Sequence, residues 1–253
     1  MGKIITIVNQ KGGVGKTTTA VNLAASLALA EQDILIIDTD PQGNLTSGLG
    51  VSRDKLERSL YDVYAGRCDI SEALVMTEMD HLNIIPSTID LLGVEVELVG
   101  REGRENILSS AINSIRDKYR YIFIDCPPSL GLLTLNALVA ADSVLIPVQC
   151  EYYALEGLGH LTKTLRLVRG SLNSDLEIEG ILLTMFDPRN NLSQEVEREV
   201  RKHFGDKVYD TVIPRNVTLG EAPSYGKPVL LYDIRSKGAQ SYLSLAREVL
   251  DHV

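Results

Sequence analysis

The apolar positions of this chain form short continuous runs that alternate with longer segments of helical spacing. The runs predict strands at residues 3–9, 34–38, 121–125, 143–148, 178–184 and 208–213. The helical segments are 17–30, 54–64, 104–118, 132–140, 155–168, 192–203 and 239–250. A continuous apolar strand is covered on both faces, and strands that alternate with helices build a parallel sheet. The pattern therefore predicts an α/β fold, a doubly wound, mostly parallel sheet with helices on both faces.

Length and composition place the chain among ordinary globular proteins. Of its 253 residues, 44% are hydrophobic and 23% charged, which fits neither a disordered nor a collagen-like chain. No repeat or linker divides it, so we expect a single domain over residues 1–253. Its three cysteines, Cys68, Cys126 and Cys150, form no Cys-x-x-Cys pair, which favours buried thiols in a reducing compartment. No apolar run reaches the roughly 18 to 20 residues of a membrane helix, and we expect a cytoplasmic protein that does not bind a membrane.

The formal net charge of −9 is distributed unevenly. Residues 1–159 carry 12 Lys/Arg and 21 Asp/Glu, a net −9, whereas residues 160–253 carry 13 of each, a net zero. A phosphate backbone responds to the local field rather than to the total charge. A basic face for nucleic acid is therefore compatible with the second half of the chain.

A glycine-rich loop separates the first expected strand from the first expected helix. It reads Lys11-Gly12-Gly13-Val14-Gly15-Lys16-Thr17-Thr18. Glycine freedom lets successive backbone N–H groups point at a polyphosphate, and the helix N-terminus behind them favours negative charge. Lys16 would neutralise the β- and γ-phosphates, and the Thr17 hydroxyl would bind Mg²⁺. The loop predicts a nucleotide site, although Gln10 stands where the usual G-x-x-x-x-G-K-T pattern has its first glycine.

The loop resembles that of the deviant Walker A ATPases, the group that holds the ParA/Soj-type partition ATPases, the division-site ATPase MinD and the nitrogenase iron protein. Similar motifs follow in order along nearly the whole chain: Asp38-Thr39-Asp40-Pro41-Gln42-Gly43-Asn44, Asp125-Cys126-Pro127-Pro128-Ser129, Pro147 to Gly157, and Ile213-Pro214-Arg215-Asn216. Together they are similar to the chromosomal ParA/Soj proteins. The resemblance implies a P-loop NTPase fold, ATP and Mg²⁺ as cofactors, and slow ATP hydrolysis that serves as a switch.

Three acidic residues follow or end expected strands, at the carboxyl edge of the sheet beside the phosphate loop. Asp125 is placed to hold Mg²⁺, directly or through water. Asp38 and Asp40 are two residues apart and point the same way if the strand continues, so one of them could position the attacking water. The resemblance gives that catalytic role to Asp40 and places Asp38 nearer the metal. A structural role as caps of helices or turns stays open, most of all for Asp38.

Two further expectations come from the resemblance. It implies that Lys11 reaches across a dimer interface to the partner's nucleotide, so that two copies enclose two ATP molecules, with Lys11, Lys16 and Asp40 as the catalytic residues. Spacing alone leaves open whether Lys11 touches its own phosphate, that of a second copy, or only solvent. The resemblance also places Pro214 and Asn216 near the adenine, and an ordinary turn after a strand is the alternative.

Candidate DNA contacts lie in the neutral second half. The resemblance makes Arg189, in a polar turn after a strand, a DNA contact. Arg198 and Arg201 share one helical face, but the interleaved Glu195, Glu197 and Glu199 fit a solvated, salt-bridged helix equally well. Lys163 and Arg166 form a second patch at helical spacing. Such contacts go to phosphates and give salt-dependent, sequence-independent binding to double-stranded DNA.

The resemblance also implies partners for the chain. They are a second copy in the ATP-bound homodimer, non-specific DNA of the nucleoid, and a ParB-type centromere-binding protein that stimulates hydrolysis and release. The alternative is a MinD-like positioning ATPase that acts on a membrane or a protein, but residues 238–253 lack the basic polar face of a membrane-binding helix. An iron protein would need a second cysteine spaced to share a cluster with Cys126. A small-molecule kinase or synthetase would need an acceptor pocket that nothing in the sequence indicates.

Overall fold

The computed structural model describes residues 2–251, and within them seven strands form one sheet. The sheet order is β3-β4-β2-β5-β1-β6-β7, and every neighbouring pair is parallel except β3 with β4. The strands are β1 (Lys3–Ile7), β2 (Ile34–Asp38), β3 (Val75–Met76), β4 (Leu82–Ile85), β5 (Tyr121–Asp125), β6 (Ser143–Gln149) and β7 (Glu177–Thr184). The predicted fold class is therefore confirmed.

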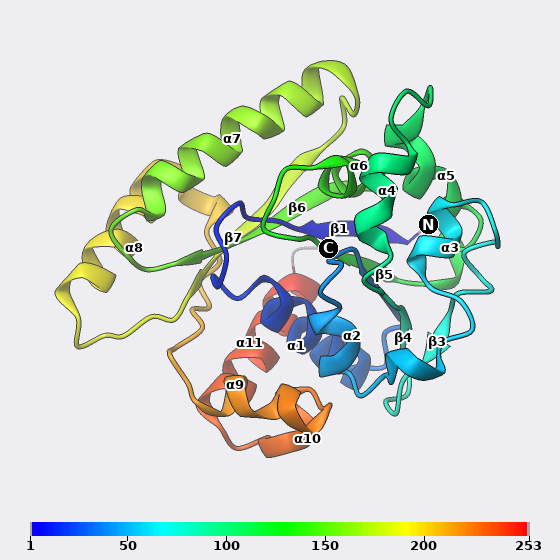
Figure 1. Cartoon of the computed structure of the whole chain (residues 1–253). Helices are drawn as coiled ribbons and strands as arrows, with labels where there is room; N and C mark the ends of the chain where they lie inside the picture. The colour runs from blue at the N-terminus through cyan, green and yellow to red at the C-terminus, as the bar shows by residue number, and fades with distance from the viewer. Residues whose placement is uncertain (1, 252–253) are drawn as a thin grey trace.

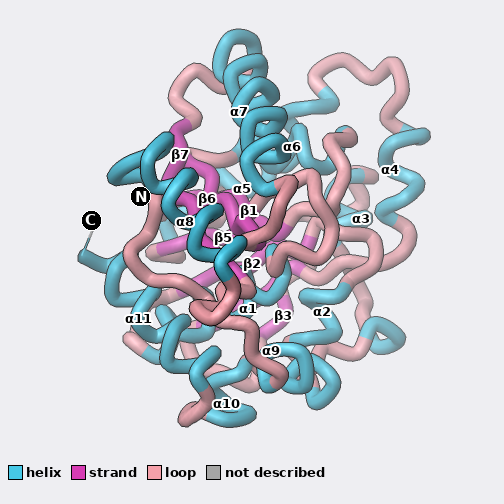
Figure 2. Tube along the Cα trace, turned by 90° about the vertical axis from the view of Figure 1, so that its left-hand side faces the viewer, coloured by secondary structure: helices cyan, strands magenta, loops and turns pink. Residues whose placement is uncertain are grey.

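Helices cover both faces of the sheet. They are α1 (Lys16–Leu29), α2 (Asn44–Gly48), α3 (Leu60–Tyr64), α4 (Leu91–Glu97), α5 (Ile107–Asn113), α6 (Leu132–Ala140), α7 (Ala154–Ser171), α8 (Asn191–Phe204), α9 (Thr218–Glu221), α10 (Val229–Asp233) and α11 (Lys237–Asp251). In Figure 1, α6 and α7 lie above the sheet, and α1 and α11 lie below it. The tube view in Figure 2 shows the strands running between these two layers.

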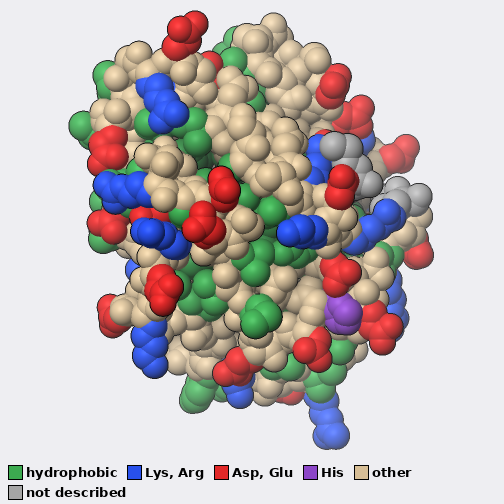
Figure 3. All heavy atoms as spheres, turned by 90° about the vertical axis from the view of Figure 1, so that its right-hand side faces the viewer, with side chains coloured by type: hydrophobic (Ala, Val, Ile, Leu, Met, Phe, Trp, Pro, Cys, Tyr) green, Lys and Arg blue, Asp and Glu red, His purple; other side chains and the backbone are tan. Residues whose placement is uncertain are grey.

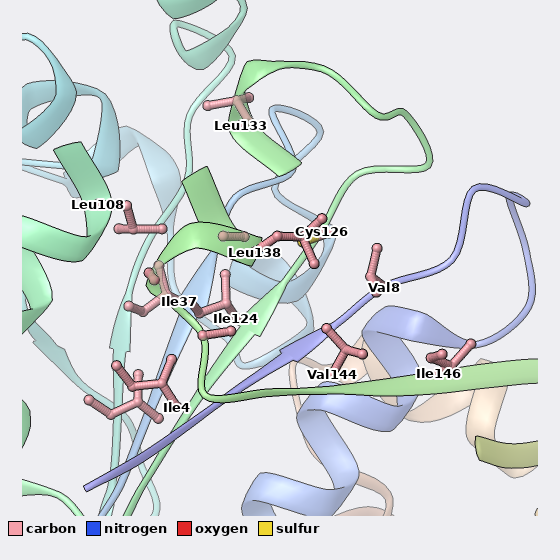
Figure 4. Close-up of a cluster of buried hydrophobic side chains, with 14 of the residues drawn as sticks. Ile4, Val8, Ile37, Leu108, Ile124, Cys126, Leu133, Leu138, Val144 and Ile146 are labelled. Carbon is pink, nitrogen blue, oxygen red and sulfur yellow. The ribbon is translucent and has the colours of Figure 1, made fainter. Parts of the chain in front are cut away.

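The two layers of core follow from the two-residue period of the strands. Ile4, Leu35 and Ile37 point to the face covered by α3 to α8, and Ile5 and Ile36 point to the face covered by α1 and α11. Figure 4 shows the first of these clusters, with side chains of β1, β2, β5 and β6 packed against α5 and α6. Both faces of the central strands are buried, which explains their continuous apolar sequence.

One predicted strand is wrong, and two predicted helices are shorter than expected. Residues 208–213 form no strand; their region contributes only isolated bridges, Ile181 with Val208 and Phe186 with Pro214. The predicted helix 54–64 is a short 3₁₀ turn followed by α3, and the predicted helix 104–118 is α5 between two 3₁₀ turns. The sequence pattern missed the short elements β3, β4, α2, α4, α9 and α10, which are held by packing rather than by periodicity.

Candidate nucleotide site

The phosphate loop lies between the end of β1 and the start of α1, where the central strands present their carboxyl ends. Gly13 and Gly15 have φ of 73° and 91°, the left-handed region that glycine adopts without a Cβ clash. Thr184, at the end of β7, donates its hydroxyl to the carbonyl of Val14 at 2.8 Å and so supports the loop from behind. The N-terminal N–H groups of α1 then face the space in front of the loop, as anion binding requires.

A cavity of about 650 Å³ opens in front of this loop. Its walls combine the phosphate loop with two distant segments, one around α2 and one before α10. The lining includes Gly12, Gly13, Gly15, Lys16, Thr17, Thr18, Asn22, Asp40, Gln42, Asn44, Ser47, Pro128, Met185, Ala222, Pro223 and Lys227. The predicted loop residues Gly12 to Thr18, apart from Val14, thus share one cavity with Asp40.

Lys16 is buried at the bottom of this cavity and donates from Nζ to the carbonyl of Lys11 at 3.2 Å. Burial lowers the pKa of Lys16, and the neighbouring Asp125 opposes that shift. A buried ammonium gains most from a compensating negative ligand. Lys16 is therefore poised for a phosphate.

Asp125 and Thr17 form the part of the cavity that fits a divalent cation. The Thr17 hydroxyl donates to Oδ2 of Asp125 at 2.7 Å, while Oδ1 of the fully buried Asp125 has no hydrogen-bond partner. Burial, and then the nearby Asp38, raise the pKa of Asp125 well above its usual range. Among residues 2–251 no group of three or more His, Cys, Asp or Glu could hold a metal by itself. A site with only one or two protein ligands is typical of Mg²⁺, because the ion keeps several water ligands and also binds phosphate oxygens.

Asp38 is fully buried, and other groups already occupy its carboxylate. Oδ2 accepts from the backbone N–H and the hydroxyl of Thr46 at 2.9 and 2.7 Å, and Oδ1 accepts from the N–H of Asp40 at 3.1 Å. Desolvation outweighs these bonds and raises the pKa of Asp38 to about 6. This geometry braces the turn into α2. The metal role of Asp38 stays a prediction.

Asp40 faces the cavity from the loop after β2. Its Oδ1 accepts from the N–H of Gln42 at 2.9 Å, and its carbonyl accepts from the hydroxyl of Ser87 at 2.6 Å. These bonds hold the backbone of the loop and leave the half-buried carboxylate at the cavity wall. That placement is what a residue that orients a water molecule needs.

Lys11 points elsewhere. Its Nζ forms an ion pair with Glu151, in the loop after β6, and Lys11 does not line the 650 Å³ cavity. The side chain is 43% exposed. Lys11 therefore lies at the rim of the site rather than inside the cavity.

A second cavity of about 500 Å³ adjoins the first and shares Gly15, Thr18 and Met185 with it. Pro214 and Asn216 line it together with Ile213, Val217 and Leu219. Oδ1 of Asn216 is buried without a hydrogen-bond partner. An apolar pocket with one unpaired amide oxygen fits a flat base that carries an amino group. The structure thus brings Pro214 and Asn216 next to the phosphate loop, about 200 residues away in sequence.

Sequence reasoning missed other residues of the two cavities. Met185 has φ of 50°, a strained left-handed backbone for a non-glycine residue, at the junction of the cavities. Ala222, Pro223 and Lys227 close the first cavity from the C-terminal side. A proline and a glycine in the stretch Ala222 to Lys227 signal a turn, but no local feature says which cavity that turn covers.

The predicted DNA contacts lie away from the cavities, on α7, α8 and the loop between β7 and α8. Lys163 and Arg166 are exposed on α7, and Arg198 is exposed on α8, which packs beside α7. Arg189 is 88% exposed and makes two 3.0 Å bonds to the carboxylate of Asp187, which lower the pKa of Asp187 to about 2. Arg201 is committed to Glu197 at 3.0 Å and to the carbonyl of Tyr209 at 3.1 Å. The solvated, salt-bridged alternative thus describes Arg201 better than Arg198.

Within residues 2–251 no helix has the length and apolar character needed to cross a bilayer. In α11 the side chains of Tyr242, Leu245 and Val249 are buried in the core. Residues 252 and 253 of the predicted tail lie outside the described part of the chain.

Solved structures of high similarity include one with a bound nucleotide. A Mycobacterium smegmatis protein described as cobyrinic acid a,c-diamide synthase, with ADP and magnesium bound, is 38% identical; the match covers 100% of this chain and 95% of that one, with a TM-score of 0.87. The cell division ATPase MinD of Pyrococcus furiosus is 30% identical, with 100% of both chains covered and a TM-score of 0.83. The first of these structures agrees with the expectation of ATP and Mg²⁺, and both agree with the P-loop NTPase fold.

Sequence relatives of higher identity include proteins named for chromosome partitioning. The sporulation initiation inhibitor protein Soj of Bacillus subtilis is 59% identical over 98% of either chain. The chromosome partitioning protein ParA of Myxococcus xanthus is 58% identical over 99% of this chain and 88% of its own length, and the chromosome-partitioning ATPase Soj of Treponema pallidum is 52% identical over 99% and 98%. A family model described as an AAA domain matches residues 2–178. With these similarities over nearly its whole length, and with the nucleotide site described above, the chain belongs to the Soj/ParA family of chromosome-partitioning ATPases.

Proposed function

We propose that this chain is an ATP-dependent dimerising switch for DNA segregation. The ATP-bound dimer binds double-stranded DNA without sequence preference, and a ParB-type partner stimulates hydrolysis and release. The observation that carries the proposal is that the two lysines of the loop occupy different positions. Lys16 is buried in the chain's own cavity, whereas Lys11 lies at its rim. These positions suit a nucleotide that Lys16 of one copy and Lys11 of a second copy contact together.

The chain's own residues supply positioning and charge. Thr17 and Asp125 would hold the Mg²⁺ that binds with ATP, and the ion would supply positive charge against the phosphates. Lys16 balances phosphate charge from the base of the cavity, and Asp40 orients a water molecule at its wall. Pro214 and Asn216 hold the base, with Asn216 accepting a hydrogen bond from its amino group. Asp38 keeps Asp40 in place through the backbone bond at 3.1 Å.

DNA binding rests on the exposed cations of neighbouring elements. Lys163 and Arg166 of α7, Arg198 of α8 and Arg189 of the loop before it are exposed in a region of zero net charge. A dimer doubles these contacts, and affinity for DNA rises steeply with the number of phosphates neutralised. ATP-driven pairing therefore explains how an acidic chain can bind nucleoid DNA only in one nucleotide state.

The test is a DNA mobility or surface-binding assay without nucleotide, with ADP, and with ATP and Mg²⁺, on two unrelated DNA sequences at two salt concentrations. We expect binding only with ATP, equal on both sequences and weaker at high salt. The double variant Lys163→Ala/Arg166→Ala should weaken binding on both sequences alike, whereas Lys118→Ala, an exposed cation of the acidic half, should not. Absence of binding in every state would overturn the DNA role and favour the MinD-like alternative.

A further inference from the structure

Helix α4 carries an apolar face that no element within residues 2–251 covers. Its residues Leu91, Val94 and Leu98 are buried in the core. On the opposite side Ile89, Leu92, Val96 and Val99 form a stripe at helical spacing, and each is between 55% and 75% exposed. Backbone hydrogen bonds from Leu91 N to Thr88 O and from Val99 N to Val96 O extend the helical winding beyond both ends of α4. The four residues are called the α4 stripe below.

The α4 stripe lies in the most one-sided stretch of the chain. Residues 68–100 contain seven Asp/Glu and no Lys or Arg, so they account for most of the net charge of −9 in the first half. Asp90, Glu95 and Glu97 flank the stripe directly and are exposed. Hydrophobic side chains also lie open between charged ones on the face beside the β3 edge (Figure 3), so exposure alone does not single out α4. What distinguishes α4 is the regular helical spacing of its exposed apolar residues and the absence of Lys and Arg from residues 68–100.

Helix α4 contacts the loops that follow β2 and β5. Leu91, Leu92 and Glu95 line a hollow of about 230 Å³ together with Asp40 and with Pro128 of the loop after β5. Oε1 of Glu95 also accepts from the backbone N–H of Leu132, the first residue of α6, at 2.9 Å. A shift of α4 would therefore reach Asp40 and the loop that follows Asp125 without crossing the core.

We propose that the α4 stripe is the docking surface for a basic, amphipathic helical segment of the protein partner, and that its docking adjusts the loop of Asp40. This inference rests on the proposed function, because it gives the stimulating partner a place on the chain. From Ile89 to Val99 the stripe spans ten residue steps, about 15 Å at 1.5 Å per residue, which matches a helix of about three turns. An apolar stripe takes the apolar face of such a segment, and the flanking acids select Lys and Arg beside it.

The test measures ATP hydrolysis against the concentration of the ParB-type protein encoded in the same genome, with DNA present. Val96→Asp/Val99→Asp should raise the partner concentration for half-maximal stimulation about 10-fold or more, as loss of an interface anchor does. Asp90→Lys should raise it too and reduce its dependence on salt. The basal ATPase and ATP-dependent DNA binding should be unchanged. Leu29→Asp, an exposed leucine in the last turn of α1, is the matched control and should behave as wild type.

Three other outcomes would overturn the docking surface, and they differ in what they leave of the proposed function. Wild-type stimulation with an unchanged half-maximal concentration in Val96→Asp/Val99→Asp overturns the docking surface but leaves the proposed function intact. Loss of ATP-dependent dimerisation in that variant, measured by analytical ultracentrifugation without the partner, would assign the stripe to a second copy and also overturn the inference. A wild-type chain that the ParB-type protein does not stimulate overturns the partner role itself, and the docking surface with it.

Discussion

Asp125 has the environment that most requires a ligand. It is fully buried, one of its oxygens has no partner, and burial together with Asp38 raises its pKa. A nearby cation favours the charged carboxylate, so Mg²⁺ would reverse the effect of burial. Lys16, with a pKa lowered by burial, gains in the same way from a phosphate. At the scale of single residues, the environments of Lys16 and Asp125 favour the binding of a phosphate and of Mg²⁺.

Asp40→Ala should separate binding from turnover. The Asp40 carboxylate accepts a hydrogen bond from the N–H of Gln42 and faces the cavity, so its removal should leave ATP affinity nearly unchanged. Turnover should fall about 100-fold or more, the range for loss of a group that assists the attacking water. Steady-state phosphate release and ATP titration measure the two effects. The exposed Asp54 provides the control, and an Asp40→Ala variant with normal hydrolysis would move the water-positioning role to another residue.

At the scale of elements, the cavity depends on contact between segments far apart in sequence. Gly50, after α2, and Gly226, before α10, have φ of 76° and 63° and meet backbone to backbone. A Cβ on Gly226 would lie 2.7 Å from the Cα of Gly50, closer than atoms can approach. Asn22 of α1 supports the same region, because its Oδ1 accepts from the N–H of Val229 at 2.7 Å. These contacts hold the C-terminal wall of the nucleotide cavity.

Gly226→Ala should therefore lower both stability and ATP affinity. Left-handed strain alone costs about 1 to 2 kcal/mol, and the overlap with Gly50 should make the loss in the free energy of unfolding larger. Gly66→Ala is the matched control, since Gly66 has φ of 69° but open space where its Cβ would lie. Urea unfolding compares the two variants, and ATP titration tests the cavity. Equal losses in both variants would show that the close approach at Gly50 is not limiting.

At the scale of the whole molecule, the proposed function depends on charge and on the pairing of two copies. The acidic half carries Lys16, Asp40 and Asp125, and the neutral half carries the exposed cations of α7 and α8. Because Lys11 lies outside its own cavity and pairs with Glu151, the ATP-bound state should require a second copy to complete the site. DNA affinity would then follow pairing, since only the dimer presents enough cations.

Lys11→Ala should abolish ATP-dependent dimerisation while leaving ATP binding to the single chain within a few-fold of wild type. The reason is that the Lys11 side chain does not line the chain's own cavity. Light scattering after size-exclusion chromatography, with ATP and with ADP, measures the dimer, and a fluorescent ATP analogue measures binding. Lys55→Ala, an exposed lysine of the same half, is the control. A Lys11→Ala variant that still dimerises with ATP would place Lys11 on its own nucleotide or in solvent.

Local sequence determined the fold class, the phosphate loop and the strand-end carboxylates of Asp38 and Asp125. These follow from short-range physics: apolar runs seek burial, glycine permits left-handed turns such as Gly13 and Gly15, and parallel strands end at a common edge. The family resemblance added roles for Lys11, Asp40, Pro214 and Asn216 that spacing alone left open.

Only the tertiary structure decided which distant segments meet. It turned the expected strand 208–213 into a connection with isolated bridges, placed Asn216 beside Gly15, and bound the Asp38 carboxylate to Thr46. It also left the α4 stripe uncovered. Such outcomes depend on long-range packing and on competition for buried hydrogen bonds, and no local window of sequence contains either.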